Sequence, residues 1–420
     1  LTLENFSLNQ LQELVLSGET RPEKWRRAQL DTLSNLLEIH QKEILNALSD
    51  DLRKPPTEAF FEIIAVKQEI KVAQKNLSNW MNLKRINIPV SLKPGKAFIQ
   101  PDPLGCILII GPWNYPFSLT LQPLAGALAA GNTAVLKPSE HAPHISGLIK
   151  KLIEKYYPRN VIQVFEGDGN TAADLMAQKF DHVFFTGGEN IGKKVMEAAA
   201  KNLTPVTLEL GGKSPAIIVD GANLEVTAKR IIWGKSLNAG QTCIAPDHLL
   251  VEQKILNSLI SNLKKSINDF YGKSPLESKH LGSIINQKQF DRLNDLLKQS
   301  KNKDQIIFGG DCNEKERRIS PTLIKIEDRN DPLMKEEIFG PLLPILSIKN
   351  LDEAITDFKS LPKPLALYLF GAREKEQEKM LSMTSSGGVC FNDVVLQAGV
   401  PELPFGGVGS SGMGKYHGKA

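Results

Sequence analysis

The stretch CILIIGP, residues 106–112, decides the fold class of this 420-residue chain. Five apolar residues in succession suit a parallel strand that is buried on both faces of a sheet. Similar runs follow and end in glycine or proline; they are NTAVLKP (132–138), VIQVFEG (161–167), HVFFTGG (182–188), PVTLELGG (205–212) and PAIIVDG (215–221). Segments with helical periodicity separate these runs, so the pattern predicts a doubly wound α/β sheet.

The flanking regions complete the predicted architecture. Residues 1 to about 80 have helical periodicity, and the segment 87–103 has two extended stretches around Lys93-Pro94-Gly95, which predicts a projecting hairpin. Further apolar runs after residue 245 predict a second α/β domain; they are HLLVE (248–252), GSIIN (282–286), QIIFGG (305–310), LLPILSI (342–348), ALYLFG (366–371) and GGVCFND (387–393). The expected fold class is therefore α/β, with two doubly wound domains and one small hairpin.

Composition and charge argue against several classes of protein. Apolar residues make up 41% of the chain and the formal net charge is only +4, without the dense basic stripe of a nucleic-acid binder. The four cysteines lie far apart with no CxxC pair, which disfavours a zinc site or a disulfide framework and fits a reducing cytosol. The first residues lack the features of a signal peptide and no apolar run reaches the length of a membrane span, so we expect a cytoplasmic protein.

Cys243 lies between a small polar turn and a proline in GQTCIAP, residues 240–246. An isolated cysteine is most often a small packing residue. A catalytic cysteine needs partner residues, which must come from elsewhere in the chain. Because ligands of doubly wound sheets collect at the carboxyl ends of strands, we look for partners directly after each apolar run.

Two polar residues at these positions suit oxyanion or acid–base chemistry. Asn114 follows the first run within PWNYP (112–116), where its amide is either an oxyanion donor or a turn residue that satisfies its own backbone. Glu209 lies inside an apolar run, between Leu208 and Leu210. Burial there would raise its pKa toward that of a general base; the alternative is a strand residue that faces the solvent.

Two other strand ends suit a dinucleotide. Lys137 and Glu140 follow NTAVL and are candidates for contact with ribose hydroxyls, or else solvated charges at a helix start. Gly187, Gly188 and Gly192 form a glycine-rich turn before a helix. The backbone N–H groups of such a turn suit a phosphate, although similar turns occur without any ligand.

Three further segments carry candidate residues or exclude a site. Glu337 and Phe339 precede Gly340-Pro341 in a loop that suits contact with a cofactor. The glycines of PFGGVGSSGMGK (404–415) allow a close backbone approach to a ligand, or else form a flexible tail. His141 and His144 have no carboxylate or cysteine at metal-ligand spacing, so no metal site is predicted.

Seven motifs in this order resemble the aldehyde dehydrogenase superfamily; they are PWNYP, LKPSE, FTGG with a following glycine, TLELGGKSP, GQTCIAPD, EEIFGP and PFGGVGSSGMG. The resemblance covers about residues 3 to 418, and GQTCIAPD and the short N-terminal region are most similar to the class 3 branch, the group with fatty aldehyde dehydrogenases. It implies the following division: an NAD(P)-binding Rossmann-like domain in 1–86 and 104–208, an oligomerisation hairpin in 87–103, a catalytic domain in 209–395, and a C-terminal segment, 396–420, that returns to the oligomerisation region and the active site.

The resemblance also implies a role for each candidate in the reaction. Cys243 would be the nucleophile, Glu209 the general base and Asn114 the oxyanion donor. Tyr115 and Phe405 match positions that line the aldehyde tunnel.

The cofactor residues follow from the same resemblance. Lys137 and Glu140 would hold the adenosine ribose, and the pyrophosphate turn would consist of Gly187, Gly188 and Gly192. Glu337 would bind the nicotinamide ribose, and Phe339 would pack near the nicotinamide.

The implied activity is the oxidation of apolar, medium- to long-chain aldehydes to acids with NAD, and with NADP to a lesser degree, through a thioester on Cys243. One rival is an acylating aldehyde dehydrogenase or an acyl-phosphate reductase, which generally lacks the glutamate of LELGG; Glu209 is present. The other is a non-catalytic, crystallin-like protein on the same scaffold, which should lose the nucleophile or the oxyanion asparagine; both are present. Apolar residues Ile88, Val90 and Ile99 on the hairpin favour a homodimer.

Overall fold

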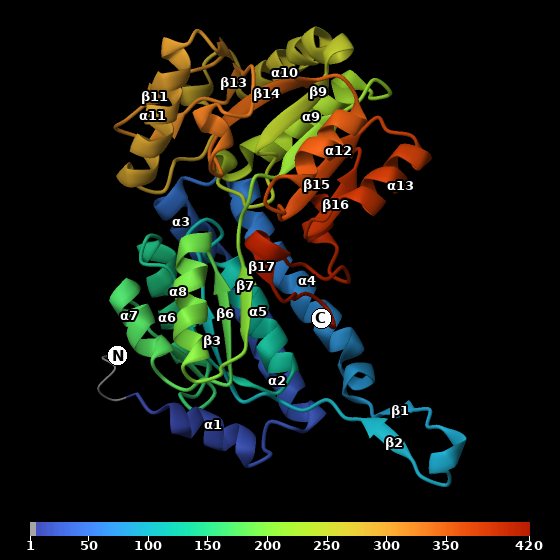
Figure 1. Ribbon diagram of the computed structural model, residues 1–420. Coiled ribbons are helices and arrows are strands. Elements are labelled where there is room, and N and C mark those ends of the chain that lie inside the picture. Colours follow the sequence, from blue (N-terminus) through green and yellow to red (C-terminus); the bar gives the residue numbers. More distant parts are fainter. Residues whose placement is uncertain (1–5) are drawn as a thin grey trace.

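The computed structural model describes residues 6–420, and the chain folds into two lobes that are each built on a mainly parallel sheet (Figure 1). The predicted α/β class with two doubly wound sheets and a hairpin is confirmed. Residues 1–5 belong to the predicted helical region and to the segment inspected for a signal peptide, and they lie outside the described residues. Within 6–420, no helix combines the length and the apolar character that crossing a membrane requires.

The first lobe begins with the helical region that the periodicity predicts. Its helices are α1 (Leu8–Leu16), α2 (Glu23–Ile39), α3 (Gln41–Leu52) and α4 (Pro56–Met81). Pro56 occupies the first turn of α4, where its missing N–H and fixed φ cost nothing. This helix runs from the junction of the two lobes down to the hairpin (Figure 1).

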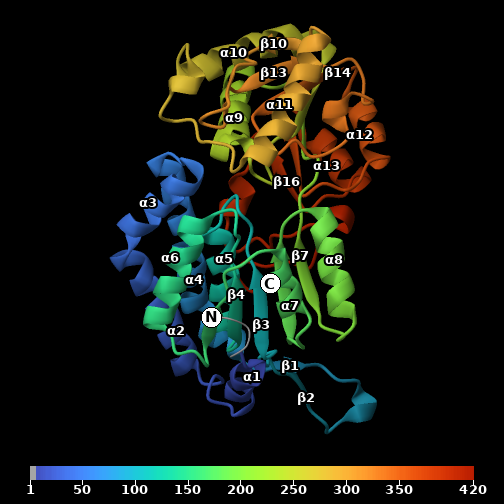
Figure 2. The ribbon, with the colours of Figure 1, turned by 90° about the vertical axis from the view of Figure 1, so that its left-hand side faces the viewer.

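A two-stranded hairpin projects from the first lobe in both views (Figures 1 and 2). Strands β1 (Lys84–Ile86) and β2 (Ala97–Ile99) pair antiparallel, with Lys84 opposite Ile99. The first strand therefore lies ahead of residue 87, where the sequence placed the start of the hairpin, because its two basic residues carry no apolar signal. The hairpin exposes apolar side chains, two between its strands and two on β2; they are Val90, Leu92, Phe98 and Ile99.

The first sheet has the strand order β17-β7-β6-β3-β4-β5. Its strands are β3 (Cys106–Ile110), β4 (Thr133–Lys137), β5 (Ile162–Val164), β6 (His182–Thr186), β7 (Val206–Glu209) and β17 (Gly412–Met413). All of them are parallel except β17, which pairs antiparallel with β7. The carboxyl ends of β3, β6 and β7 therefore meet at one edge, where PWNYP, TGG and LGG follow the strands.

Helices cover both faces of this sheet, which explains why its strands are continuously apolar. Ile107 and Ile109 of β3 pack into a core with α2, α3, α4, α5 (Ser118–Ala129) and α6 (Pro143–Tyr156). The alternate residues Leu108 and Ile110 pack against α1, α7 (Gly169–Met176) and α8 (Glu189–Ala200). Successive side chains along the strand thus pack into two separate hydrophobic cores, one on each face of the sheet.

The second sheet has the order β10-β13-β14-β9-β8-β15-β16, parallel except for β10. Its strands are β8 (Pro215–Ile218), β9 (His248–Glu252), β10 (Ile306–Phe308), β13 (Thr322–Lys325), β14 (Leu342–Ile348), β15 (Ala366–Phe370) and β16 (Gly388–Phe391). Between β10 and β13 in the sequence, the chain forms a separate two-stranded antiparallel sheet of β11 (Cys312–Asn313) and β12 (Arg318–Ile319).

Two groups of helices sandwich this second sheet. Leu250 of β9 faces a core with α11 (Gln287–Asn302), α12 (Leu351–Lys359) and α13 (Glu374–Met383). Leu249 faces the opposite core with α9 (Leu224–Ser236) and α10 (Leu256–Tyr271). The layer arrangement repeats that of the first lobe.

The prediction of a strand at GSIIN (282–286) is wrong, because this segment is a buried loop ahead of α11. The backbone N–H of Ile284 donates to the carbonyl of Arg317 at 2.8 Å, and that of Ile285 donates to Oε1 of Gln241 at 3.0 Å. These contacts satisfy the backbone without a sheet ladder. A short buried apolar run does not by itself reveal which partner its backbone takes.

The C-terminal segment crosses back from the second lobe to the first. Strand β17 places Gly412 opposite Glu209 at the end of β7. Beyond it, Tyr416 exchanges two backbone hydrogen bonds with Phe405, each 2.8 Å long. The marked C-terminus consequently lies near the middle of the molecule in both views (Figures 1 and 2).

Candidate active site

A cavity of about 720 Å³ lies where the two lobes meet. It collects residues from the strand ends of the first sheet and from loops of the second lobe. The predicted residues that line it are Asn114, Gly187, Gly188, Glu209, Cys243, Glu337 and Phe339. Seven residues that are dispersed over the sequence thus border one space, as expected for the carboxyl edge of a doubly wound sheet.

Cys243 lies on a loop after an unusual backbone segment. Asn238, Ala239 and Gly240 have successive φ values of 53°, 53° and 79°, in the left-handed region that non-glycine residues rarely occupy. Gly240 is required for space as well, because an added Cβ would lie 2.3 Å from the carbonyl oxygen of Gly340. The surrounding fold therefore holds a strained conformation directly ahead of the cysteine.

The thiol of Cys243 is partly exposed to the cavity and is a free cysteine. Desolvation raises its pKa well above the usual value, and the negative charges of Glu337 and Glu209 raise it further. The resting group is therefore a neutral thiol near pH 7. A reaction that begins with sulfur attack must remove this proton.

Asn114 is held in place from both of its ends. Its side-chain nitrogen Nδ2 donates to the carbonyl oxygen of Gln241 at 3.1 Å, two residues ahead of Cys243. Its own carbonyl oxygen accepts from Nζ of Lys54 at 2.8 Å and from Nδ2 of Asn238 at 2.7 Å. An amide NH2 carries two hydrogens, so one remains for a ligand in the cavity.

Glu209 is buried at the end of β7, and neither of its carboxylate oxygens has a hydrogen-bond partner among the described residues. Burial raises its pKa to about 9. The prediction of a buried, perturbed carboxyl is thus correct, and the alternative of a solvent-facing residue is wrong. A desolvated carboxyl with two free oxygens beside a cavity is a natural proton acceptor for a bound molecule.

A buried charge network joins the cysteine loop to the loop of Glu337 and Phe339. The carboxylate of Asp247 accepts from the backbone N–H of Ile338 at 2.8 Å through Oδ1 and from Nζ of Lys213 through Oδ2. Nζ of Lys213 also donates to the carbonyls of Leu333 and Glu336 at 2.8 and 2.9 Å. Burial alone would raise the pKa of Asp247, but the charges of Lys213 and Lys235 and the contact with His248 together outweigh it and hold the pKa below its usual value.

The loop itself is fixed close to the strand ends of the first sheet. Nη2 of Arg292 donates to the carbonyl of Ile338 at 2.6 Å. The ring of Phe339 meets that of Trp113 edge to face, with centroids 5.2 Å apart. Glu337 lies so near Gly211 that an added Cβ there would be 2.1 Å from Oε2, and burial raises the pKa of Glu337 to about 8.

The glycine-rich turn offers unoccupied donors at the start of a helix. Gly188 is the residue that precedes α8, and no side chain caps this end. Within the described part of the chain, the N–H groups of Gly188, Glu189 and Asn190 have no acceptor. Gly192 lies one turn into α8, where a Cβ would come within 2.8 Å of Leu210, so it permits close packing of the helix on the strand end.

The remaining predicted residues lie outside the lining of this cavity. Lys137, at the end of β4, is buried and contacts Glu140 at 2.6 Å, and Glu140 is exposed. The hydroxyl of Tyr115 lies 2.7 Å from Oγ1 of Thr242, the neighbour of Cys243. Phe405 packs against the same apolar core of the second lobe as Cys243.

Sequence reasoning missed the residues that hold the site together. Asp247 and Lys213 stand inside two motifs, GQTCIAPD and ELGGKSP, but no role was assigned to either. Their charges beside apolar runs were the available signal. Lys54 gave no signal, because its contact with Asn114 joins positions 60 residues apart.

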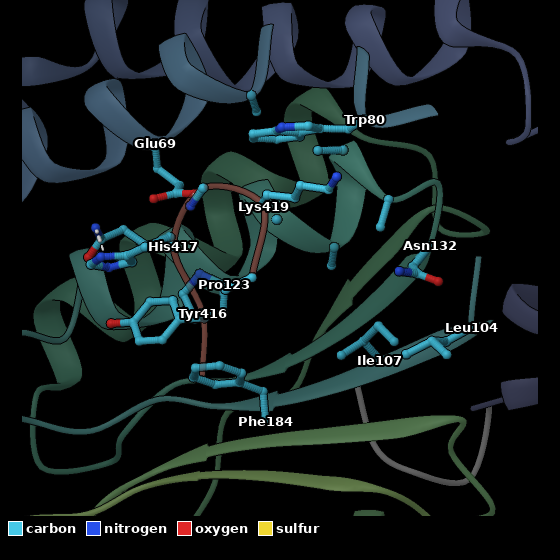
Figure 3. Close-up of a pocket in the computed structure, with 18 of the residues that line it drawn as sticks. Glu69, Trp80, Leu104, Ile107, Pro123, Asn132, Phe184, Tyr416, His417 and Lys419 are labelled. Carbon is cyan, nitrogen blue, oxygen red and sulfur yellow. Dashed lines mark hydrogen bonds between the residues drawn. The ribbon is translucent and has the colours of Figure 1, made fainter. Parts of the chain in front are cut away.

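A second cavity, of about 370 Å³, contains none of the predicted site residues. Figure 3 shows it between α4, α5 and the first sheet, with Trp80, Tyr416, His417 and Lys419 around it. Glu69 of α4 accepts from the backbone N–H of Gly418 at 3.0 Å, and Tyr416 packs edge to face on Phe184 with centroids 5.0 Å apart. These contacts fix the C-terminal segment against the first lobe.

Comparisons with known proteins agree with the motifs. Residues 18–420 match the model of the aldehyde dehydrogenase family. The chain is 46% identical to a 4,4'-diaponeurosporen-aldehyde dehydrogenase of Staphylococcus aureus, over 96% of this chain and 87% of that protein, and 44% identical to a dimeric NADP-preferring aldehyde dehydrogenase of Mus musculus, over 98% and 90%.

Family 3 members and solved structures are similar over equally long stretches. The chain is 45% identical to aldehyde dehydrogenase family 3 member A2 of Pongo abelii, over 99% of this chain and 85% of that protein. A substrate-bound structure of Staphylococcus aureus AldH superimposes with a TM-score of 0.95 at 44% identity, covering 98% of this chain and 90% of that one. The chain therefore belongs to the aldehyde dehydrogenase family, is similar to its class 3 branch as the motifs predicted, and is an oxidoreductase that acts on aldehydes.

Proposed function

We propose that this enzyme oxidises apolar, medium- to long-chain aldehydes to carboxylic acids through a thioester on Cys243, with NAD as the main cofactor and NADP as a second one. The observation that carries the proposal is the single cavity that Cys243, Glu209 and Asn114 share with Glu337 and Phe339. An aldehyde has no leaving group, so a sulfur adduct is needed before hydride can depart. The cavity supplies a nucleophile, an oxyanion donor and a base together.

The first half of the proposed reaction takes place on Cys243. The thiol first loses its proton to water in the cavity, and the thiolate sulfur then attacks the aldehyde carbon. The developing oxyanion accepts hydrogen bonds from the free hydrogen of Asn114 Nδ2 and from the backbone N–H of Cys243. One such donor typically lowers the activation free energy by about 3 kcal/mol. A bound nicotinamide cofactor supplies the acceptor for hydride. Collapse of the tetrahedral adduct leaves the acyl group on the sulfur.

The second half is hydrolysis of the thioester, with Glu209 as the general base. Its two carboxylate oxygens have no protein partner, so a water molecule in the cavity competes with no other donor for them. A base with a pKa of about 9 accepts a proton readily but is mostly protonated at pH 7. Deacylation in this proposal therefore accelerates as the pH rises toward 9.

The residues present fit a dinucleotide. The free N–H groups at the start of α8 suit a pyrophosphate, because a helix N-terminus attracts anions. We assign Lys137 and Glu140 to the adenosine ribose, Glu337 to the nicotinamide ribose and Phe339 to the nicotinamide ring. The carboxylate of Glu140 would repel a 2′-phosphate. Nζ of Lys137, which lies 2.6 Å from Oε2 of Glu140, would offset part of that repulsion.

The substrate class rests on the apolar surroundings of Cys243. The core on which Cys243 packs also contains Phe405, Val395 and Ala398. The hydroxyl of Tyr115 is hydrogen-bonded to Thr242, the residue directly ahead of the cysteine. In a pocket of this kind, each methylene of the substrate contributes only about 1–3 kcal/mol of binding energy, so the enzyme discriminates weakly between neighbouring chain lengths. We therefore expect a broad preference for long apolar aldehydes.

The division of labour follows the two sheets. We propose that residues 1–86 and 104–208 bind the cofactor, that 209–395 carry out the chemistry, and that 396–420 return to the first lobe and the active site. We further propose a cytoplasmic homodimer joined through the hairpin, which exposes Val90 and Phe98. All four cysteines are free, which fits a reducing compartment.

Steady-state formation of NADH from decanal tests the proposal. Turnover without coenzyme A or phosphate, with decanoate as product, supports it. A requirement for coenzyme A or phosphate identifies an acylating enzyme instead, and no turnover of any aldehyde identifies a structural protein on the same scaffold. The same assay with acetaldehyde tests the substrate class, because equal kcat/KM for both aldehydes contradicts an apolar pocket.

A further inference from the structure

A fully buried ion pair lies beneath the loop that carries Asn114. Lys54 lies directly ahead of α4, and Glu62 is in the second turn of that helix; both side chains are completely excluded from solvent. Nζ of Lys54 contacts Oε1 of Glu62 and donates to the carbonyl oxygen of Asn114 at 2.8 Å. The ammonium also lies 4.0 Å from the ring centroid of Tyr115. The cation thus contacts two consecutive residues of PWNYP.

Glu62 fixes the other end of the same loop. Its Oε2 accepts from the backbone N–H groups of Phe117 and Ser118, both at 3.0 Å, where α5 begins. The pair therefore contacts residues 114–118 at a carbonyl and at two N–H groups. This arrangement leaves the peptide of Asn114 little freedom to rotate.

The same part of α4 also holds the segment ahead of Cys243. Oε2 of Glu58 accepts from the backbone N–H of Asn238 at 2.8 Å, and Nδ2 of Asn238 donates to the carbonyl of Asn114 at 2.7 Å. Asn238 is one of the left-handed residues before the nucleophile. The start of α4 consequently connects the oxyanion loop with the cysteine loop, although the two belong to different lobes.

Stability alone is a poor explanation for this ion pair. Burial of two charges costs desolvation energy that their attraction rarely repays with a surplus. The carbonyl of Asn114 already has a neutral donor in Asn238. What the cation adds is a second, charge-assisted bond to one carbonyl, which restricts its direction.

We propose that Lys54, oriented by Glu62, is a positioning residue for the oxyanion step: it fixes the backbone of Asn114 so that the side-chain amide reaches the oxyanion on Cys243. Lys54 itself touches neither substrate nor cofactor in this assignment. The inference rests on the proposed function, because it requires Asn114 to act as the oxyanion donor. A displacement of about 1 Å in such a donor is enough to reduce the rate by about a hundredfold.

The test is a double-mutant cycle on the rate of the first NADH burst with decanal, measured by rapid mixing at saturating NAD. Asn114→Ala is expected to slow the burst by about 10²–10³-fold. Lys54→Met is expected to slow it by at least about tenfold while the dissociation constant of NADH, measured by fluorescence, stays unchanged. In the Asn114→Ala background, Lys54→Met should slow the burst by less than about twofold, because a group that acts through Asn114 has nothing left to position.

Arg318→Met is the matched control, since Arg318 is another buried cation that donates to backbone carbonyls, those of Leu276, Ser278 and Leu281, away from the cavity. It should lower the thermal midpoint without changing the burst rate per folded site. If Lys54→Met fails to fold, Lys54→Met combined with Glu62→Gln removes both charges of the ion pair and replaces it in the cycle.

Three results would overturn the inference. Equal losses from Lys54→Met in both backgrounds would assign it a general structural role, and an unchanged burst rate would assign it none. A full burst in Asn114→Ala would remove the oxyanion assignment and this inference with it. Decanal turnover that still depends on Cys243 would in that case leave the proposed function standing.

Discussion

The side-chain nitrogen of Asn114 lies 3.1 Å from the carbonyl oxygen of Gln241, across the junction of the two lobes. Asn114 follows β3 of the first sheet, whereas Gln241 belongs to the loop that leads to Cys243 in the second lobe. This hydrogen bond brings the amide to the nucleophile and uses only one of its two hydrogens. Catalysis in the proposed scheme depends on this arrangement of a donor from one lobe and a thiol from the other.

Replacement of Cys243 by serine should abolish aldehyde oxidation and leave cofactor binding intact. A hydroxyl is far less acidic than a thiol, and in our assignment the pyrophosphate binds the N–H groups at the start of α8 and not the thiol. NADH production from decanal and NADH fluorescence titration measure the two properties. Cys312→Ser, at an exposed cysteine far along the chain, is the control and should keep full activity. More than a small residual activity in Cys243→Ser would refute the nucleophile.

Deacylation should accelerate with pH up to about 9. Burial raises the pKa of Glu209 to about 9, and a general base acts in its deprotonated form, so the active fraction grows about tenfold per pH unit well below that value. Rapid-quench intact mass spectrometry follows the loss of the acyl group from Cys243 between pH 6.5 and 9. A deacylation rate that stays flat over this range would exclude Glu209 as the titrating base.

Cofactor preference should respond to the charge of residue 140. We expect higher kcat/KM with NAD than with NADP, and Glu140→Gln should reduce the ratio by about tenfold, equivalent to about 1.4 kcal/mol. The reason is that a neutral amide no longer repels the 2′-phosphate while Lys137 remains. Glu197→Gln, at an exposed glutamate about two turns into α8 and outside the cavity lining, is the control for a general change in charge. A strong preference for NADP in the unchanged enzyme would contradict the placement of Glu140 at the ribose.

Loss of the Asp247 charge should destabilise the fold strongly. Asp247→Asn leaves Lys213 without its buried partner, and breaking a buried pair typically costs about 3–5 kcal/mol. Glu225→Gln breaks an exposed pair with Lys229 and should cost less than about 1 kcal/mol. Denaturant unfolding compares the two variants. Equal midpoints would show that the network joining the cysteine and cofactor loops contributes little.

The hairpin should determine the oligomeric state. Charges introduced with Val90→Asp and Phe98→Asp at two exposed apolar positions of the hairpin should convert a dimer to a monomer in light scattering at micromolar concentration. Leu203→Asp, at a leucine after α8 that is more exposed than either of these residues, should leave the dimer intact. A monomer before any substitution would exclude the hairpin as an interface.

The extent to which sequence predicted this protein has a physical explanation. Continuous apolar runs such as CILII report burial on both faces, so the sheets and their carboxyl edge were predictable, as were Asn114, Glu209 and Cys243 as residues bordering one cavity. The hairpin strand at Lys84 was not, because its pairing leaves no apolar pattern. GSIIN has the composition of a strand, but its backbone finds partners in Arg317 and Gln241.

The supporting contacts were hidden for a different reason. Lys54 holds Asn114 through a backbone carbonyl, and such an acceptor is present at every residue, so its partner leaves no mark on the sequence. Asp247 likewise supports Ile338 through a backbone N–H. Motifs identify residues by the chemistry of their side chains and miss those that act on a main chain far away.

The most direct test of the central claim, a thioester on Cys243 that Glu209 hydrolyses, is the reaction of Glu209→Gln with decanal and NAD. Glutamine keeps the shape of the side chain but accepts no proton, which typically costs about 10²–10⁴-fold. The account predicts a rapid burst of about one NADH per active site, then near arrest, with a decanoyl group on Cys243 in the intact mass. Undiminished steady turnover with an unmodified Cys243 would contradict it.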